Sequence, residues 1–333
     1  MDHMKILKRA WTIVWRYKAL WLFGFLFALA GGGGGSSGGG GSGSGPRTGV
    51  QGSGGNGGGM PFSLPTSIDW NTAWIIVVVA VAVIILLAVI MTILRYVSET
   101  AMIAGVDEVE GTGDQLTVRR GFRLGWSRQA LQLFLVDLVV GLPLALVIIT
   151  LLVLGLSPLL LLAVKTDVAR VIGIVATIGL ELLVILFIIA VALVVSVVMP
   201  YIRRRVVLGK QGILASIRQG VAMVRASLMD TGLMWLLLVG VQIVQWIVFI
   251  PVLILVFALA VAVGGVPGGL IYLVSKSWVP AAIVGGLLFL IVLIPPLTFV
   301  RGLFELYLST SWTLAYRDVV ARHSDLLPAP DAA

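Results

Sequence analysis

The sequence predicts an all-α fold: a polytopic transmembrane helix bundle of about six spans, with cytoplasmic amphipathic interface helices. Of its 333 residues, 59% are hydrophobic and only 11% are charged, whereas soluble domains average about 25% charged residues. Several apolar runs reach the roughly 20 residues that cross a bilayer core of about 30 Å. Basic residues flank these runs. This composition excludes a soluble globular enzyme.

Residues 1–30 are expected to form a basic, aromatic amphipathic helix followed by a marginal first span. The fully apolar part, residues 19–30, would be about 18 Å long as a helix. It would cross only within one tilted helix over residues 11–30, with Arg16 and Lys18 reaching the headgroups. Ala28-Leu29-Ala30 also resembles a signal-peptide cleavage site, so removal of this segment is the alternative.

Residues 31–69 are predicted to be a flexible extracytoplasmic loop rich in glycine and serine. Between residues 31 and 59, 18 of 29 residues are glycine, and such a composition supplies no side chains with which to build a core. At the other end of the chain, residues 323–333 are expected to be a disordered tail.

Residues 70–322 are predicted to form a five-span bundle with interface helices on its cytoplasmic side. The five clear spans are Ala73–Leu94, Ala130–Leu154, Val171–Met199, Gly232–Val263 and Val279–Val300. Three other segments carry an apolar stripe at helical spacing beside basic residues, which is typical of helices that lie in the membrane interface. The stripes are Met4, Leu7, Trp11 and Val14; Leu214, Ile217, Val221, Val224 and Leu228; and Phe304, Leu308, Trp312, Ala315 and Val319.

A short internal repeat is suggested by two matching segments. Residues 117–121 (TVRRG) align with residues 216–220 (SIRQG) at an offset of 99, and each precedes a long span that contains a proline, Pro143 or Pro251. This pattern favours a parallel repeat of interface helix, outgoing span and returning span. Pro200 is expected to end a span, and the prolines inside spans either open a cavity or only curve their helices.

The distribution of Lys and Arg predicts the orientation. With the N-terminus inside, the cytoplasmic segments hold 19 cations and the opposite segments hold 4. An excess of Lys and Arg marks the cytoplasmic side of membrane proteins. We therefore expect a multi-pass protein of a bacterial plasma (inner) membrane with both termini in the cytoplasm.

Two carboxylates, Asp137 and Glu181, lie inside predicted spans. Burying a charge in hydrocarbon costs at least about 2.5 to 3.5 kcal/mol, so such residues are candidates for a proton or substrate path. Their depths differ by more than about 10 Å, which argues against a dyad that shares one proton. The competing interpretation is that each is protonated and hydrogen-bonds to a neighbouring helix, because the spans contain no obvious cationic partner.

Aromatic and basic residues gather where headgroups are expected. Trp and Tyr prefer the headgroup layer, and adjacent cations engage lipid phosphates. We therefore predict that these residues anchor the chain to anionic headgroups. They are Trp11, Trp15, Arg16, Tyr17, Lys18, Trp21, Arg203, Arg204, Arg205, Trp312, Tyr316 and Arg317.

The sequence predicts no catalytic residue, no metal site, no cofactor and no nucleic-acid partner. It contains no cysteine and only two histidines, His3 and His323, and both lie near the ends of the chain. The positive charge is explained by membrane topology. An intramembrane enzyme is the least favoured class, because no paired catalytic groups are evident.

The two ends of the chain carry a family likeness. The opening WTIVWRYKALWLFG at residues 11–24, the glycine-rich loop behind it and the closing SWTLAYR at residues 311–317 resemble uncharacterised bacterial six-helix membrane proteins. These are similar to the membrane domain of some glycerophosphoryl diester phosphodiesterases. The catalytic domain of that family is a separate soluble barrel, so the resemblance implies a non-catalytic membrane module.

Two functions follow. The first is a non-enzymatic membrane scaffold or accessory module that contacts lipids, a membrane-protein partner or a second copy of the chain. The second is a small proton-coupled transporter or permease that uses Asp137 and Glu181 as protonatable stations.

Overall fold

The computed structural model describes residues 2–31, 70–113, 116–163, 166–209 and 211–322. All regular elements in these ranges are helices, which confirms the all-α prediction. They are α1 (His3–Arg16), α2 (Ala19–Leu29), α3 (Trp70–Thr112), α4 (Val118–Gly125), α5 (Arg128–Leu156), a 3-10 helix η2 (Ser157–Ala163), α6 (Asp167–Gly209), α7 (Ile213–Ala226), α8 (Leu228–Ser275) and α9 (Trp278–Arg322).

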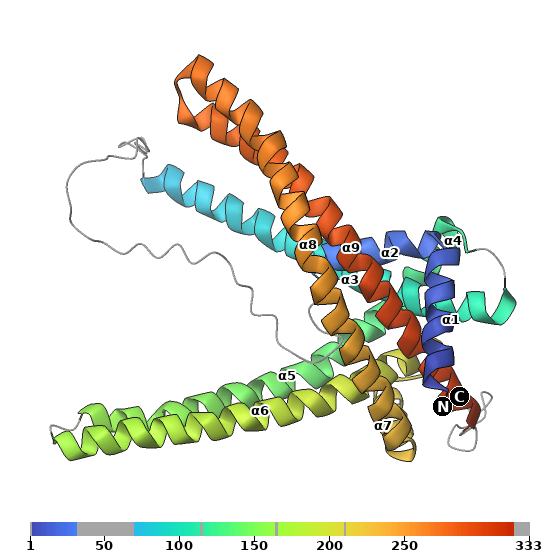
Figure 1. The fold of residues 1–333 in the computed structure, drawn as a ribbon. Helices are drawn as coiled ribbons and strands as arrows, with labels where there is room; N and C mark the ends of the chain where they lie inside the picture. Colours follow the sequence, from blue (N-terminus) through green and yellow to red (C-terminus); the bar gives the residue numbers. More distant parts are fainter. Residues whose placement is uncertain (1, 32–69, 114–115, 164–165, 210, 323–333) are drawn as a thin grey trace.

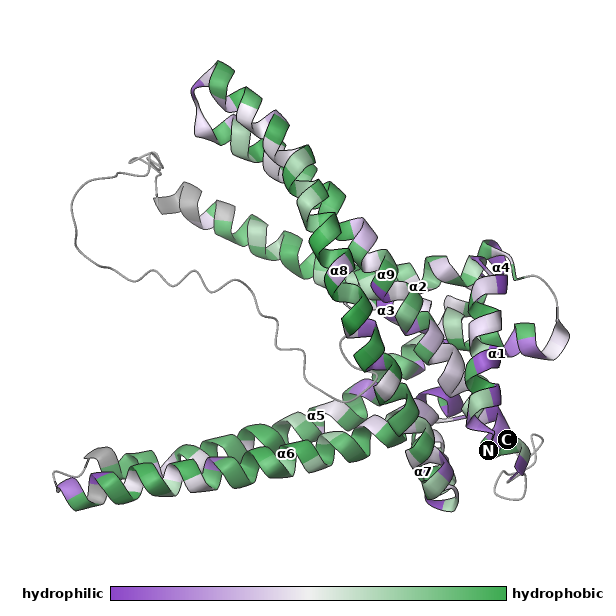
Figure 2. Ribbon diagram, in the orientation of Figure 1, coloured by the Kyte–Doolittle hydropathy of each residue, from purple (hydrophilic) through white to green (hydrophobic). Residues whose placement is uncertain are grey.

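The helices radiate from one region, which we call the hub (Figure 1). The hub consists of residues 2–28, 95–113, 116–137, 195–209, 211–241 and 301–322, and it holds the three clusters of buried apolar side chains. Two antiparallel helix pairs, α5 with α6 and α8 with α9, leave the hub in different directions, and the first half of α3 forms a third arm. Figure 2 shows that the arms are mostly hydrophobic and that hydrophilic residues gather in the hub.

Within the described ranges, five helices are long and apolar enough to cross a membrane, and the number rises to six if the bent pair α1 and α2 counts as one span. They contain all five clear spans predicted from the sequence. Their most apolar 18-residue windows are only 0 to 17% buried inside the protein. The same helices run on without a break into the hub, so the inner parts of the spans also build its core.

The first span differs from its prediction. Residues 11–30 do not form one tilted helix, because the chain bends by 98° between α1 and α2. At 11 residues, α2 is about 16 Å long, well short of a hydrocarbon core of about 30 Å. It packs instead on α9, where Gly24 and Gly302 meet so closely that a Cβ on Gly302 would lie 2.6 Å from the Gly24 carbonyl oxygen.

Two further predictions are corrected in the hub. Pro200 does not end its helix, since α6 continues to Gly209. The C-terminal apolar stripe is not a separate interface helix: it continues α9, and Leu308, Trp312 and Val319 are at most 5% exposed. The predicted spacing of the stripe is correct, but protein covers it.

The order of elements agrees with the predicted repeat. The matching segments fall at α4 and α7, and each of these short basic helices is followed by a long hairpin, α5 with α6 or α8 with α9. The predicted glycine-rich loop, apart from Gly31, and the predicted tail lie outside the described residues.

Candidate functional site: a buried charge cluster in the hub

Arg203 of α6 lies at the centre of a buried ion-pair cluster that joins three helices. Its Nη1 donates to Glu99 Oε1 of α3 at 2.8 Å, and its Nη2 donates to Asp137 Oδ1 and Oδ2 of α5 at 3.0 and 2.8 Å. The Tyr96 hydroxyl of α3 donates to Asp137 Oδ2 at 3.0 Å. The side chains of Arg203 and Glu99 are each only 7% exposed.

Arg204 extends the cluster to a fourth helix. Its guanidinium donates to the Pro200 carbonyl oxygen at 2.9 Å and to the Ser309 carbonyl oxygen of α9 at 3.0 Å. On the other side, Arg205 Nε donates to Gln219 Oε1 of α7 at 2.6 Å. Of these three consecutive arginines, Arg203 binds α3 and α5, Arg204 binds α9, and Arg205 binds α7.

A small cavity of about 20 Å³ lies between these groups, with Glu99, Arg203, Arg204 and Glu305 among its lining residues. Three buried atoms of these lining residues have no protein hydrogen-bond partner: Glu99 Oε2, Arg203 Nε and Arg204 Nε. A cavity of this size holds about one water molecule, which needs two to four polar partners. The cavity thus has room for one water molecule beside these three unpartnered atoms.

A buried ion pair has a large desolvation cost, and it is tolerated when its geometry is good and its remaining atoms are hydrogen-bonded. Arg203 divides its two terminal nitrogens between two carboxylates: Nη1 donates to Glu99, and Nη2 donates to both oxygens of Asp137. Hydrogen bonds between two charged groups are stronger than those between neutral groups. Since Glu99, Asp137 and Arg203 come from three helices, the cluster fixes the positions of those helices relative to one another. The terminal nitrogens of Arg203 and Arg204 all bind oxygen atoms of the protein, so the arrangement is suited to holding helices together.

This geometry corrects two predictions. Asp137 does have a cationic partner, because α6 continues past the third clear span and carries its arginine run into the hub. Arg203, Arg204 and Arg205 are only 6, 5 and 7% exposed, so they contact protein instead of presenting their charges to lipid headgroups.

The second predicted carboxylate, Glu181, lies far from the cluster. It is 22 residues from Arg203 on the same helix, which corresponds to about 33 Å. Its carboxylate packs against Gly155 of α5, and Glu181 Oε1 is buried without a hydrogen-bond partner. The structure therefore does not bring Asp137 and Glu181 together, in agreement with the sequence argument against a dyad.

The predicted N-terminal anchors fall at the bend between α1 and α2. Trp11 and Trp15 are 56 and 49% exposed, and Arg16 and Lys18 are also exposed. The Trp11 and Trp15 rings lie 5.5 Å apart. Tyr17 and Trp21 are half-buried and pack on the hub core. Contact of these residues with headgroups stays a prediction.

The predicted C-terminal anchors are placed differently. Trp312 and Tyr316 are 5 and 4% exposed and pack around the fully buried Tyr201. These two rings belong to the protein core, so the headgroup prediction fails for them. Arg317 is half-exposed, and its Nη1 donates to Asp107 Oδ1 at 2.7 Å.

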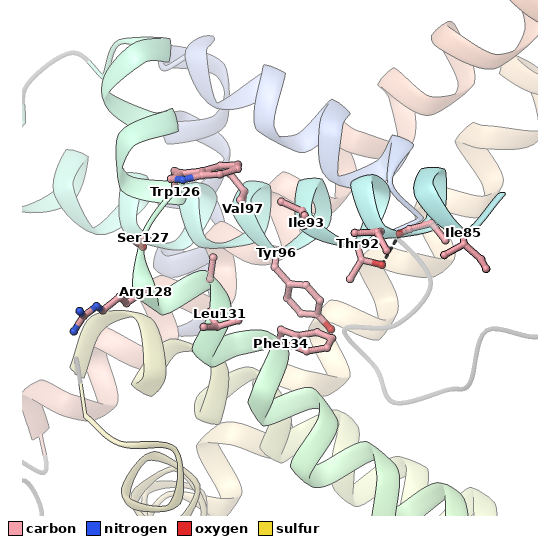
Figure 3. A pocket seen from close by; sticks show the side chains of 13 residues that line it. Ile85, Thr92, Ile93, Tyr96, Val97, Trp126, Ser127, Arg128, Leu131 and Phe134 are labelled. Carbon is pink, nitrogen blue, oxygen red and sulfur yellow. Dashed lines mark hydrogen bonds between the residues drawn. The ribbon is translucent and has the colours of Figure 1, made fainter. Parts of the chain in front are cut away.

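A large apolar groove of about 830 Å³ runs between α3 and the beginning of α5. Figure 3 shows Trp126, Ser127 and Arg128 at one end of the groove and Ile85 at the other, with Tyr96 and Phe134 between them. No group of three or more metal-binding side chains occurs in the described ranges. The candidate sites of the described chain are thus a structural charge cluster and an apolar groove.

Together these features define a multi-helix protein whose apolar arms are compatible with several membrane spans. Residues 12–321 match the model of a family of unknown function, DUF7544. The match covers most of the chain, so the protein belongs to this family. No curated protein and no solved structure matches the chain. The comparisons confirm an uncharacterised family, and they give no support for bacterial origin or for likeness to the phosphodiesterase membrane domain.

Sequence reasoning missed Glu99, Tyr96 and Glu305 as members of the cluster. Glu99 and Tyr96 lie beyond the end of a predicted span, where polar residues are ordinary, and Glu305 falls in the stretch read as an interface helix. The predicted span bounds gave no signal for the pairing: Asp137 lies seven residues inside its span, whereas Glu99 and Arg203 lie five and four residues beyond the ends of theirs.

Proposed function

We propose that this protein is a non-enzymatic integral plasma-membrane scaffold or accessory module that contacts lipids and partner membrane proteins. The observation that supports this most strongly is the low burial of the apolar arms within the chain. Their apolar windows are at most 17% buried within the chain, so almost all of that surface is available to lipid or to other helices. Large exposed apolar surfaces mark interaction sites, and membrane helices associate through packing of such faces.

The non-enzymatic assignment is supported by the chemistry of the hub. A catalytic group must reach a substrate, whereas Arg203, Glu99 and Asp137 are buried and mainly bind one another. The exposed basic residues of α4 and α7 would then face anionic headgroups at the cytoplasmic surface, with both termini on that side. In this proposal, the membrane-protein partner includes a second copy of the chain, which would give a homo-oligomer.

Purification in native nanodiscs followed by quantitative mass spectrometry tests the proposal. We expect a protein partner, or a second copy of the chain, at stoichiometric level. The matched comparison uses Gly265→Leu and Gly240→Leu, because both glycines lie in α8 with no other residue near the position of an added Cβ. Gly265 lies beside the small residues of the α8 and α9 arm, and bulk there should lower partner recovery more than at Gly240. A chain that purifies alone from nanodiscs would overturn the scaffold role.

A proton-coupled transporter is the second candidate, and one observation favours it: Glu181 Oε1 is buried in an arm without a partner. Glu181→Gln separates the two functions, because it removes the titratable proton with little change of shape and lies outside the hub. A transporter should lose proton uptake into proteoliposomes, read with an internal pH-sensitive dye. A scaffold should show no uptake above that of empty vesicles, in the wild type and in the Glu181→Gln variant alike, and should keep its partner in both.

A further inference from the structure

The groove between α3 and α5 has the shape of a site for a single lipid chain. Its α3 wall consists of residues at positions 85, 88, 89, 92, 93, 96 and 97, a stripe at helical spacing. This stripe spans 12 residues, or about 18 Å. One leaflet of a bilayer core is about 15 Å thick, half of about 30 Å, so the groove matches an acyl chain that crosses one leaflet.

The polar groups along the groove are already satisfied by the protein. The Thr92 hydroxyl donates to the Ala88 carbonyl oxygen at 2.7 Å, and the Tyr96 hydroxyl donates to Asp137. The remaining middle of the groove is hydrocarbon, including Ile85, Val89 and Phe134 (Figure 3). The walls therefore offer no free hydrogen-bonding group to a polar chain, and they favour an aliphatic one.

Free polar groups are found at one end only. Arg128 is exposed, and no ion-pair partner is found for it in the part of the chain that the structure describes. Ser127 Oγ is buried without a hydrogen-bond partner. Ser127 also precedes the 29-residue helix α5 without capping it through its side chain, so first-turn amide groups with a positive dipole face this end.

The surroundings of this end are cationic and aromatic. Arg119 and Arg123 are exposed on α4, and the exposed rings of Phe122 and Trp126 stack with centroids 6.1 Å apart. Trp at an apolar-to-polar boundary with adjacent arginines is typical of the headgroup layer. The groove is therefore apolar along its length and cationic at one end, which matches a ligand with an apolar chain and an anionic head.

We propose that the groove between α3 and α5 binds one anionic phospholipid, with an acyl chain along Ile85 to Tyr96 and the headgroup phosphate at Ser127 and Arg128. The inference rests on the proposed membrane function and adds a specific lipid site to it. Anionic character comes from Arg128 and the amino-terminal end of α5, and chain selectivity comes from the apolar walls. The bound lipid fills the space between the α3 arm and the α5 and α6 arm.

The test compares lipid retention by four variants of the full chain. The protein is reconstituted in nanodiscs containing equal amounts of phosphatidylglycerol and phosphatidylcholine, re-extracted in mild detergent and analysed by native mass spectrometry. The wild type should retain one phosphatidylglycerol in preference to phosphatidylcholine, and excess inorganic phosphate should not displace it. Arg128→Gln should lower the preference about fivefold, the amount expected for one basic contact near a membrane surface. Arg218→Gln, at an exposed position on α7 outside the groove, is the control for general headgroup contact and should lower the preference by clearly less than Arg128→Gln does.

The second pair of variants tests the groove itself. Ala88→Trp fills the groove and should lower retention of both lipids, whereas Ala80→Trp, at an exposed position of the same helix outside the groove, should not. Equal retention of the two lipids by the wild type, or no effect of both Arg128→Gln and Ala88→Trp, would overturn the lipid site. A protein cross-linked to Ala88→Cys in a chain that has no other cysteine would assign the groove to a partner helix instead.

The outcomes for lipid and for partner distinguish this proposal from the proposed function. Loss of lipid preference with the protein partner retained would leave the scaffold proposal intact. Retained lipid without any protein partner would overturn the scaffold proposal alone.

Discussion

Arg203 fixes the positions of α3, α5 and α6 relative to one another in the hub. A guanidinium presents planar, fixed donors, and Arg203 uses them to bind Glu99 and Asp137 at the same time. The two carboxylates belong to α3 and α5, so neither helix can rotate without breaking a buried contact. Removal of one partner from a buried pair is costly because it leaves an uncompensated charge.

Arg203→Gln should therefore lower the free energy of unfolding by about 3 to 5 kcal/mol, measured as unfolding in mixed detergent micelles. The stability of Arg203→Lys should lie between those of the wild type and Arg203→Gln, because an ammonium group keeps the charge but cannot form the same fork. Arg218→Gln is the control and should change stability by less than about 0.5 kcal/mol.

If Arg203→Gln proves too unstable to purify, Glu99→Gln and Asp137→Asn give the same test through a double-mutant cycle, in which non-additive losses are expected. Additive losses would contradict a shared cluster.

Sequence reasoning at the residue level succeeded where a local pattern suffices and failed where a partner is distant. Asp137 was recognised because a carboxylate inside an apolar run is unusual. The fate of Arg203 was missed because its partners are 104 and 66 residues away, and an arginine run after a span is also what a headgroup anchor looks like. Trp312 was misplaced for the same reason, since an aromatic stripe does not reveal whether lipid or protein covers it.

At the level of elements, close helix packing depends on glycines that face each other. A Cβ on Gly285 of α9 would lie 2.8 Å from the Gly264 carbonyl oxygen of α8, whereas a Cβ on the adjacent Gly286 would meet nothing within 4 Å. Small residues let membrane helices approach closely, and their dispersion contacts hold the helices together. The α8 and α9 arm is thus tightly packed on one face and open on the other.

Gly285→Ala should separate the two helices and lower stability by about 1 to 3 kcal/mol, the usual effect of overpacking. Gly286→Ala adds the same methyl group to the same helix, one residue away, and should be neutral or slightly stabilising because alanine favours helix. Thermal unfolding in detergent, followed by far-ultraviolet circular dichroism, compares the two. Equal melting temperatures would show that the small-residue contact contributes nothing to the arm.

The elements themselves were predictable from hydropathy to a useful extent. All five clear spans lie inside the observed helices because burying about 20 apolar residues leaves the chain few alternatives. The helix ends were not predictable, since α3, α6, α8 and α9 continue into the hub, where they pack against other helices. The bend before α2 was also missed, and the contact of α2 with Gly302 lies far along the chain, where local sequence gives no sign of it.

At the scale of the whole molecule, the hub lies at one end of the long helices and the apolar arms extend away from it (Figure 1). The positive-inside pattern then predicts that the hub faces the cytoplasm and that the turn between α8 and α9 faces the opposite side. The natural absence of cysteine allows single labels to test this orientation without a mutated background.

Ser277→Cys and Ala222→Cys provide the test, since Ser277 is exposed in the turn between α8 and α9 and Ala222 is exposed on α7. In intact cells, a membrane-impermeant maleimide should label the cysteine at position 277 but not the one at position 222. After permeabilisation both should react. Labelling of position 222 alone in intact cells would reverse the orientation, and labelling of both would contradict a hub confined to one side.

Helix α3 has a mechanical consequence. It is 43 residues long and contains no proline, so it forms a continuous rod of about 65 Å. Its outer half has no buried residue in its most apolar window, whereas its inner half holds Tyr96 and Glu99 in the hub. In the proposed membrane setting, a change in the tilt of the exposed half would therefore move Glu99 relative to Arg203, so α3 would couple bilayer thickness to the alignment of the buried charges.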